Sequence, residues 1–445
     1  MTIGIGLLGL GTVGAGVAEI LASPEGRHPL VAELALRRVA VRDLNRPRPV
    51  AVAADLLSTD AEAVVDDPAV DIVVEVMGGL EPARTLILRA IGAGKPVVTA
   101  NKAVIARHGE EIAAAAAAAG VYVLLEAAVG GGIPIIEPLK QSLGANRIQR
   151  VSGIINGTTN YILSRMAAEG ADYGEVLADA QRLGYAEADP AADVQGADAA
   201  DKIAILTGLA YGGSVPREAI PTEGIDRLDA RDVAYADKLG FVVKLLAVSQ
   251  LIDTEPGTEQ QPGCQLLDVR VHPTLLPRDH PLAGVNGVFN AILVEGDPVG
   301  QVMFYGPGAG AGPTASAVVA DILNIAGIRQ ATAPSGSAAG PVGIDPLLAA
   351  GSWRQCRLID GALTTHRNYV RLRTSDQAGV IGRIGTCFGQ AGVSIQSIVQ
   401  FEADSEAAEI VVITHEVLEA HFRQALDAIA ALPEVQGVAA CLRTF

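Results

Sequence analysis

The chain has 445 residues, too many for a single compact core, and this length predicts two to four domains. Apolar residues make up 49% of it, and 50 Gly and 24 Pro accompany them, a composition typical of α/β domains with many tight turns. The formal net charge of −17 repels phosphate backbones and argues against a nucleic-acid partner.

The N-terminal apolar run, residues 3–10, has no basic region before it and no cleavage site, so we do not expect a signal peptide. A second apolar stretch, residues 112–125, is mostly alanine, is broken by Gly120, and falls short of the roughly 20 residues of a membrane span. We therefore expect a cytoplasmic protein that does not enter a membrane. Four scattered cysteines, with no C-x-x-C pair, fit reduced cytosolic thiols: Cys264, Cys356, Cys387 and Cys441.

The N-terminal region alternates predicted strands with helices. A strand over residues 2–8 leads through a glycine turn at 9–14 into a helix that ends near residue 21. Further strands of continuous apolar residues are separated by helices, which is typical of a parallel sheet covered on both faces. The sequence thus predicts an α/β, Rossmann-type doubly wound domain. The later strands are expected at 36–41, 71–76, 96–100 and 121–125.

The pattern changes after the glycines at 130–132. Long helices now alternate with strand-like segments, which predicts an α+β domain with a mainly antiparallel sheet. A second glycine loop, residues 306–310, introduces a helix to about residue 325, and a linker rich in Ala, Gly, Pro and Ser follows at 329–351. The helices are expected at 173–183, 191–211 and 231–250, and the strands at 150–155, 265–272, 289–294 and 301–305.

The tail has the order βαββαβ, which is the ferredoxin-like plan. Its strands are expected at 369–373, 393–401, 409–415 and 438–442, and its helices at 379–389 and 418–431. We expect four parts in all: a first domain at 1–130 completed by 306–325, a second domain at 131–305, a linker at 326–364, and a tail domain at 365–445.

The turn Gly9-x-Gly11-x-x-Gly14 lies between the first strand and the first helix. There the glycines permit a tight turn, a close approach of backbone to pyrophosphate, and close helix packing, while the helix N-terminus attracts the phosphates. An ordinary turn is the alternative. We expect the cofactor to contact Gly9, Gly11, Thr12, Val13 and Gly14 in this turn.

The end of the second strand bears on which nicotinamide dinucleotide binds. An acidic residue there takes the ribose 2′-hydroxyl of NAD, whereas Arg accommodates the 2′-phosphate of NADP. The sequence has Arg42 followed by Asp43, which favours NADP and leaves NAD possible. A solvated basic strand end is the alternative interpretation.

Two lysines are candidates for chemistry. Asp198 and Lys202 are four residues apart and share a helix face, in front of an apolar run that would bury the helix. A partly desolvated lysine among carboxylates can move a proton at a reacting oxygen, and the carboxylates can hold an ammonium group. Lys102 follows a strand at the ligand-binding edge of the parallel sheet. An acidic capping loop with a surface ion pair, and a solvated loop lysine, remain the alternatives.

Together these segments resemble homoserine dehydrogenase over about residues 1–325, and the tail resembles an ACT regulatory domain. The run from Gly184 to Lys202 is close to a signature of that family, with Asp189-Pro190, Asp193, Gly196 and Asp198 at the matching positions. The other matching stretches are 9–14, 99–102, 126–134 and 153–161.

The resemblance implies an oxidoreductase that interconverts L-homoserine and L-aspartate 4-semialdehyde with NAD(P) in threonine, methionine and isoleucine biosynthesis. It implies that Lys202 is the general acid/base and that Lys102 lies beside the nicotinamide and the substrate. Gly78 and Gly306 would also contact the cofactor. Glu187 would hold the substrate's amino group, with Asp193 and Asp198 positioning substrate, lysine or water. It also implies a sodium ion held by Glu126, through side chain or carbonyl, and by the carbonyls of Val129, Gly131 and Ile133.

The ACT resemblance implies allosteric control by an amino acid, usually L-threonine in this family, and pairing across subunits in a homodimer or homotetramer. The effector residues would be Asp376, Gly379 and Val380. Many ACT domains have Asn where Ser394 stands here, which is a departure at the ligand site. A purely structural dimerisation module is the alternative for the tail.

Two other functions stay open at this point. A semialdehyde dehydrogenase working through a thioester needs an activated cysteine, and the first cysteine, Cys264, lies outside any nucleophile motif. A non-catalytic sensor of NADP and amino acids has no need for a lysine beside carboxylates.

Overall fold

The computed structural model describes residues 2–252, 264–332, 345, 347–349, 351–404 and 407–445. The chain forms two compact units, each assembled from separate stretches of sequence. The first unit comprises Met1–Val151, Asp201–Ala219 and Phe289–Cys356, and the second comprises Ser152–Ala200, Ile220–Val288 and Arg357–Phe445. Each unit is described by itself below.

The first unit contains a six-stranded parallel sheet in the order β3-β2-β1-β4-β5-β6. This is the strand order of a Rossmann fold, and the predicted doubly wound sheet is confirmed. Its strands are β1 (Ile3–Leu8), β2 (Leu34–Ala40), β3 (Leu57–Ser58), β4 (Ile72–Glu75), β5 (Val97–Thr99) and β6 (Val123–Leu124).

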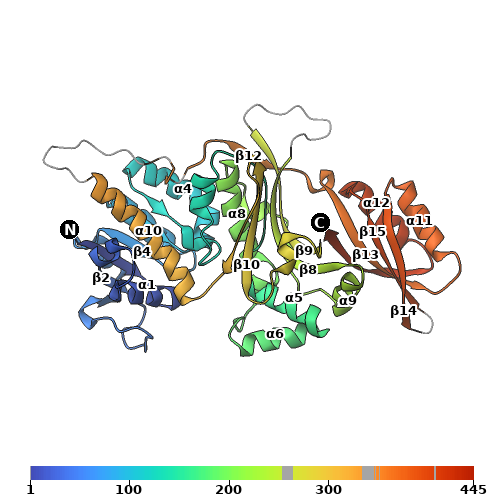
Figure 1. The fold of residues 1–445 in the computed structure, drawn as a ribbon, viewed down its shortest axis with the longest axis horizontal. Helices are drawn as coiled ribbons and strands as arrows, with labels where there is room; N and C mark the ends of the chain where they lie inside the picture. The colour runs from blue at the N-terminus through green and yellow to red at the C-terminus, as the bar shows by residue number, and fades with distance from the viewer. Residues whose placement is uncertain (1, 253–263, 333–344, 346, 350, 405–406) are drawn as a thin grey trace. The chain divides into compact units, whose positions relative to one another are not determined.

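Helices cover both faces of this sheet. On one face α1 (Thr12–Ala22) and α10 (Ala311–Thr332) lie side by side over Ile5, Leu7 and their neighbours (Figure 1). On the other face α2 (Ala61–Asp66), α3 (Ala83–Gly92) and α4 (Lys102–Ala119) bury the alternate strand residues. The strands β1, β4 and β5 are fully buried and show no alternation of exposed residues, because both of their faces are covered, whereas β2 exposes Arg37 and Arg38.

The helix α10 returns to the sheet from a distant part of the sequence. It is long and apolar enough to cross a membrane by length and composition, but half of that stretch is buried, and it packs on the sheet core. It begins after the antiparallel strands β10 (Phe289–Asp297) and β11 (Gly300–Pro307). It also extends seven residues beyond the predicted end, into the predicted linker, whose residues 333–344, 346 and 350 lie outside the described part of the chain.

The second unit combines helices with antiparallel strands, as predicted. Strand β7 (Arg147–Ile154) leads into it from the first unit, and β8 pairs with β9 in an antiparallel register from Phe241 opposite Pro277. Its elements are α5 (Gly157–Glu169), α6 (Tyr173–Arg182), α7 (Ala191–Val194), α9 (Ala230–Lys238), β8 (Phe241–Ile252) and β9 (Cys264–Pro277).

Two predicted helices differ from those observed. The helix expected over 231–250 was wrong in its second half, because α9 ends at Lys238, Gly240 has φ +86°, and β8 follows. The run after Gly240 is rich in Val and Leu and suits a buried strand. The helix expected over 191–211 is divided at Gly196 (φ +83°) into α7 and α8 (Ala197–Tyr211).

The tail has the predicted βαββαβ order within the second unit, with one additional two-residue strand, β16, before its second helix. Its sheet runs β17-β13-β15-β14, and β17 also pairs in parallel with β9 through Arg443 and Thr274, so the tail continues the sheet of this unit. A further strand, β12 (Gln355–Leu358), precedes it. The elements of the tail are β13 (Thr365–Ser375), α11 (Val380–Gln390), β14 (Ile395–Asp404), β15 (Ala407–Thr414), β16 (Val417–Leu418), α12 (Glu419–Ala430) and β17 (Val435–Thr444).

Candidate active site

The glycine turn leaves the N-terminus of α1 open. Gly9 has φ +103°, which favours glycine, and a Cβ on Gly14 would lie 2.1 Å from the carbonyl oxygen of Gly9. Gly11 occupies the N-cap position without a side-chain cap, and a Cβ placed on it would meet no atom within 4 Å. Thr12 and Val13 form the first helical turn. The free N–H groups there suit the pyrophosphate of a dinucleotide.

The loop after β2 carries the residues expected at the adenosine ribose. Arg42 and Asp43 are both exposed, and Asp43 accepts a hydrogen bond from the Asn45 backbone N–H at 2.8 Å. The Arg48 guanidinium donates to the carbonyl oxygen of Leu44 at 3.1 Å and also to that of Asp43. Hydrogen bonds within the loop therefore hold its shape, and Arg42 is exposed. The loop follows β2 at the edge of the sheet where dinucleotides bind.

A buried polar network stands at the carboxyl ends of β4 and β5. The Thr99 hydroxyl donates to the Glu75 carboxylate at 2.7 Å and accepts from the Asn101 backbone N–H at 3.0 Å. The Asn101 amide donates to the Gly79 carbonyl at 2.8 Å. Glu75 is fully buried, and Lys102 follows Asn101 as the first residue of α4. The network fixes the backbone that presents Lys102 and holds the glycine segment 78–79 beside it.

Sequence reasoning did not assign Glu75 or Thr99 to the site. An ionisable residue within the apolar run of β4 was the available signal, because a buried acid needs hydrogen-bonding partners.

Helices α4 and α8 are joined by an ion-pair network in the first unit. The Asp201 carboxylate accepts from the Arg217 Nε at 2.6 Å and from the Arg107 guanidinium at 3.1 Å. Asp201 is buried and immediately precedes Lys202, whose exposed fraction is only 9%. The network therefore ties the helix that begins at Lys102 to the helix that carries Lys202. Neither arginine was predicted: Arg107 is 94 residues from Asp201 along the chain, and Arg217 is 16 residues from it.

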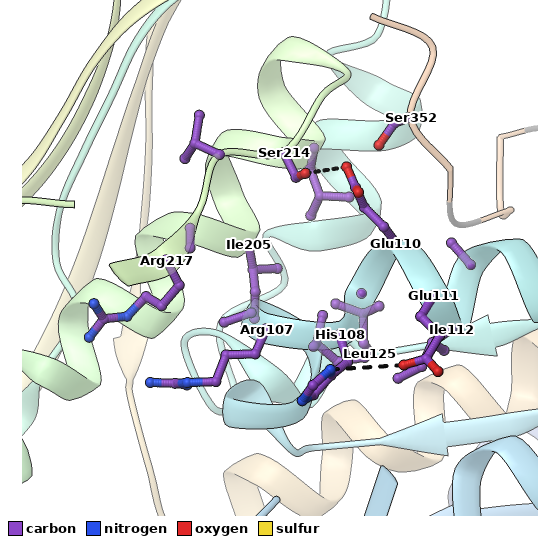
Figure 2. A pocket seen from close by; sticks show the side chains of 18 of the residues that line it. Arg107, His108, Glu110, Glu111, Ile112, Leu125, Ile205, Ser214, Arg217 and Ser352 are labelled. Carbon is purple, nitrogen blue, oxygen red and sulfur yellow. Dashed lines mark hydrogen bonds and ion pairs between the residues drawn. The ribbon is translucent and has the colours of Figure 1, made fainter. Parts of the chain in front are cut away.

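A cavity of about 670 Å³ lies between α4 and α8. Ile112, Leu125 and Ile205 contribute apolar side chains to it, and the Ser214 hydroxyl donates to the Glu110 carboxylate at its wall (Figure 2). None of the glycine-turn residues 9–14 lines it. The cavity is thus distinct from the predicted dinucleotide site.

The second unit brings two of the predicted substrate residues together. The Asn156 side-chain nitrogen donates to the Asp193 carboxylate at 2.7 Å and to the Asp198 carboxylate at 2.9 Å. Asp198 is 9% exposed, and Lys202 follows it by four residues on α8, as the sequence predicts. Asn156 lies within the matched stretch 153–161, but its role was not predicted.

Glu187 lies on the loop before α7, where it is exposed. Its backbone carbonyl accepts from the Gln181 side-chain amide at 3.0 Å. The structure therefore places the third predicted substrate residue on the surface of a loop, in contrast to the buried Asp198.

Two glycine segments pack backbone against backbone in the first unit. A Cβ on Gly131 would lie 2.4 Å from the Gly308 carbonyl oxygen, and the Gly132 N–H donates to the Pro307 carbonyl at 3.2 Å. A Cβ on Gly308 would lie 1.9 Å from the Asn290 amide nitrogen. Gly306 is near the end of β11, so this close packing brings it near the predicted cation segment.

The predicted cation residue Glu126 already has backbone partners. Its carboxylate accepts hydrogen bonds from the backbone N–H groups of Ile135 (2.6 Å), Ile136 (2.9 Å) and Glu137 (2.7 Å). Burial raises the pKa of Glu126 despite these three donors. The side chain therefore fixes the 135–137 backbone.

An acid from α10 lies against the same segment. The Glu126 backbone N–H donates to one carboxylate oxygen of Asp321 at 2.8 Å, and the other oxygen of Asp321 is buried without a hydrogen-bond partner among the described residues. Burial raises the pKa of Asp321 well above its usual value. An unpaired buried oxygen beside Glu126 is compatible with a cation or with a protonated carboxyl group.

The predicted effector residues form the loop that enters α11. Asp376 is exposed and accepts from the Gln400 side-chain amide at 3.0 Å. Gly379 has φ +92° at the N-cap of α11, and the buried Val380 begins the helix. The three residues are thus brought together at one helix N-terminus.

Comparison with protein families gives three matches along the chain. Residues 9–126 match the model described as "Homoserine dehydrogenase, NAD binding domain", residues 134–323 match "Homoserine dehydrogenase", and residues 368–434 match "ACT domain".

Individual relatives match over nearly the full length. The homoserine dehydrogenase of Synechocystis sp. is 57% identical, covering 100% of this chain and 99% of that protein, and that of Corynebacterium glutamicum is 42% identical, covering 99% and 95%. The crystal structure of a homoserine dehydrogenase from Thiobacillus denitrificans is similar with a TM-score of 0.86 at 41% identity, over 100% of this chain and 98% of that one. A hyperthermophilic archaeal homoserine dehydrogenase in complex with NADPH has a TM-score of 0.60 at 29% identity, over 74% and 98%.

Proposed function

Because the chain belongs to the homoserine dehydrogenase family, we propose which of its residues carry out the reaction of that family. The reaction is the reversible NAD(P)H-dependent reduction of L-aspartate 4-semialdehyde to L-homoserine, in threonine, methionine and isoleucine biosynthesis. Among the open alternatives, neither a thioester-forming dehydrogenase nor a non-catalytic sensor has support from these relatives.

Lys202 is the general acid in the reductive direction. A bound nicotinamide supplies hydride to the aldehyde carbon, and negative charge then develops on the aldehyde oxygen. The Lys202 ammonium stabilises this charge and donates a proton to the oxygen, and its burial strengthens the interaction. Lys102, at the start of α4, supplies a second cation beside the nicotinamide. In the oxidative direction neutral Lys202 accepts the proton from the homoserine hydroxyl.

Carboxylates bind the substrate ammonium group. Asp193 and Asp198 are held together by Asn156, and Asp198 shares a helix face with Lys202. Glu187 contributes a further carboxylate from its loop. Asp198 and Lys202 are both carried by α8, so an ammonium group bound at Asp198 lies about one helical turn from Lys202 along that helix.

The observation that carries this assignment is the Asp201 network. It joins the helix of Lys102 to the helix of Lys202 through two arginines, so both cations are held on rigid elements of one unit. The test is the oxidation of NADPH with L-aspartate 4-semialdehyde, compared with an aldehyde of similar size that lacks the ammonium group. We expect turnover with the first substrate and at least about 100-fold less with the second. Equal rates would refute ammonium recognition.

The cofactor is NADP, with NAD as a second substrate of lower affinity. The solved structure of an archaeal homoserine dehydrogenase is a complex with NADPH, and the family match covers the glycine turn. Arg42 supports the preference, because its guanidinium lies at the surface of the loop that follows β2.

A sodium ion belongs to the segment from Glu126 to Ile133. The carbonyl oxygens of Glu126, Val129, Gly131 and Ile133 would hold it, and its charge would stabilise the packed glycine segments. The buried, unpaired oxygen of Asp321 supports the assignment.

The ACT domain responds to an amino acid, which we assign as L-threonine bound by Asp376, Gly379 and Val380. A buried network connects the domain to the rest of its unit. Arg371 on β13 forms two hydrogen bonds with Asp232 on α9, at 2.7 and 2.9 Å, and one with Glu409 on β15 at 2.7 Å. An effector that moves the ACT sheet therefore acts directly on α9.

Self-association completes the assembly, as a homodimer or homotetramer. Tyr305 and Met303 on β11 are exposed, and Tyr305 stacks on the exposed Phe289 at 5.2 Å between ring centroids. Such an apolar patch is typical of a subunit interface.

The enzyme works in the cytoplasm, without nucleic-acid or membrane partners. Its functional parts are 1–130 with 306–325, 131–305, the linker 326–364, and 365–445.

A further inference from the structure

We propose that Asn156 is a positioning residue for the reaction, because its single amide group fixes the two carboxylates that bind the substrate ammonium group. This inference rests on the proposed roles of Asp193 and Asp198. It adds a residue whose role is to act through those two side chains.

The orientation of the Asn156 amide is determined by its partners. The amide oxygen accepts the Thr159 backbone N–H at 2.9 Å, which caps α5, and lies 3.0 Å from the Thr159 hydroxyl. A backbone N–H can only donate, so the oxygen must face the helix. The amide nitrogen must then face Asp193 and Asp198, at 2.7 and 2.9 Å, where ionised carboxylates can only accept.

Asparagine is the side chain that performs both tasks. Two carboxylates close to one nitrogen repel each other, and the two N–H groups of the amide offset this repulsion. Aspartate would cap the helix equally well but would add a third negative charge. Serine would cap the helix without an N–H group for the acids, and alanine would do neither.

The N-terminal part of α5 is held from its buried side, which keeps Asn156 in place. Asn160, one turn further on, donates to the Val285 carbonyl at 3.2 Å and accepts from the Lys244 ammonium at 3.1 Å. Asn160 is 1% exposed and Lys244 is 3% exposed. The Asn156 amide therefore stands at a rigid helix end. We expect its position to determine the distance between the Asp193 and Asp198 carboxylates.

The experiment compares Asn156→Ser and Asn156→Asp with the wild-type full-length enzyme in homoserine-dependent NADP reduction. Both variants keep a capping oxygen, so we expect their melting temperatures to stay within about 3 °C of wild type. We expect the KM for homoserine to rise at least about 10-fold in Asn156→Ser and further in Asn156→Asp, while the KM for NADP stays unchanged. The matched control is Asp60→Ala, which removes an exposed cap of α2 (2.9 Å to the Ala63 N–H) and should leave both KM values unchanged.

A milder variant tests the same idea if those two fail to fold. Thr159→Val removes only the hydroxyl group beside the amide oxygen, in a buried position of similar shape, and should raise the KM for homoserine about 2- to 3-fold. An unchanged KM for homoserine in every folded variant would overturn the proposal for Asn156. The proposed function fails separately, if wild type does not reduce NADP with homoserine or if Asp198→Ala does not affect the reaction.

Discussion

Two alanine substitutions in the glycine turn separate the packing of the turn from its use as a binding site. In Gly14→Ala the new Cβ would lie 2.1 Å from the Gly9 carbonyl oxygen, whereas ordinary contacts begin at 3.4 Å, so the start of α1 must move by about 1.3 Å. Such overpacking costs about 1–3 kcal/mol and should lower the melting temperature by several degrees. The displaced helix N-terminus should also lose about 1–2 kcal/mol of cofactor binding, or 5- to 30-fold in Kd.

Gly11→Ala should affect binding more than stability. Its Cβ meets no atom within 4 Å in the protein, so the change should cost only the preference for Gly over Ala at an N-cap, about 0.5–1 kcal/mol, but the methyl group occupies the space that the pyrophosphate needs. Gly92→Ala in α3, where a Cβ also meets nothing, is the matched control. Thermal unfolding and NADPH titration by fluorescence measure both effects. The reasoning is refuted if Gly11→Ala binds NADPH like wild type, or if Gly14→Ala melts like Gly11→Ala.

Three further predictions concern the cofactor, the buried acid and the ACT network. Arg42→Ala should raise the KM for NADPH about 10-fold and leave that for NADH within 2-fold; parallel changes would contradict a 2′-phosphate contact. Folding raises the pKa of Asp321, so the wild-type protein loses stability as the pH rises above the usual pKa of an aspartate. Asn cannot ionise, so the melting temperature of Asp321→Asn should rise relative to that of wild type from pH 5 to pH 8. The opposite trend would indicate a cation bound there. Arg371→Met should cost about 3–5 kcal/mol in urea unfolding, because the buried Asp232 carboxylate loses its ion-pair partner and keeps the Tyr369 hydroxyl. Arg231→Met, whose side chain is 54% exposed, should cost under about 1 kcal/mol, because Glu409 keeps Arg371 and the Tyr235 hydroxyl; equal losses would contradict this distinction.

The Rossmann sheet was predictable because its signals are local. Apolar strands without alternation, the turn at Gly9–Gly14 and the helices between strands each constrain the chain within a few residues. The helix predicted over 231–250 failed because the apolar run after Gly240 is compatible with a strand or a helix by composition, and pairing of β8 with β9 decides between them.

The candidate site was predictable in its residues but not in the contacts that hold them. Asp198 and Lys202 are four residues apart, which predicts that they share a helix face, and in the structure both lie on α8. Asp201 with Arg107 and Arg217, by contrast, depends on segments up to 94 residues apart that meet only in the folded chain. The Glu126 carboxylate illustrates the same limit, because its three backbone donors are turned toward it only after the 135–137 segment folds.

The central claim is that the Lys202 ammonium donates the proton to the aldehyde oxygen. The most direct measurement is single-turnover oxidation of NADPH by L-aspartate 4-semialdehyde in wild type, Lys202→Met and the exposed control Lys238→Met. We predict a loss of at least about 100-fold in Lys202→Met, with unchanged NADPH affinity and melting temperature, and no loss in the control. Turnover of folded Lys202→Met within 3-fold of wild type would contradict the account.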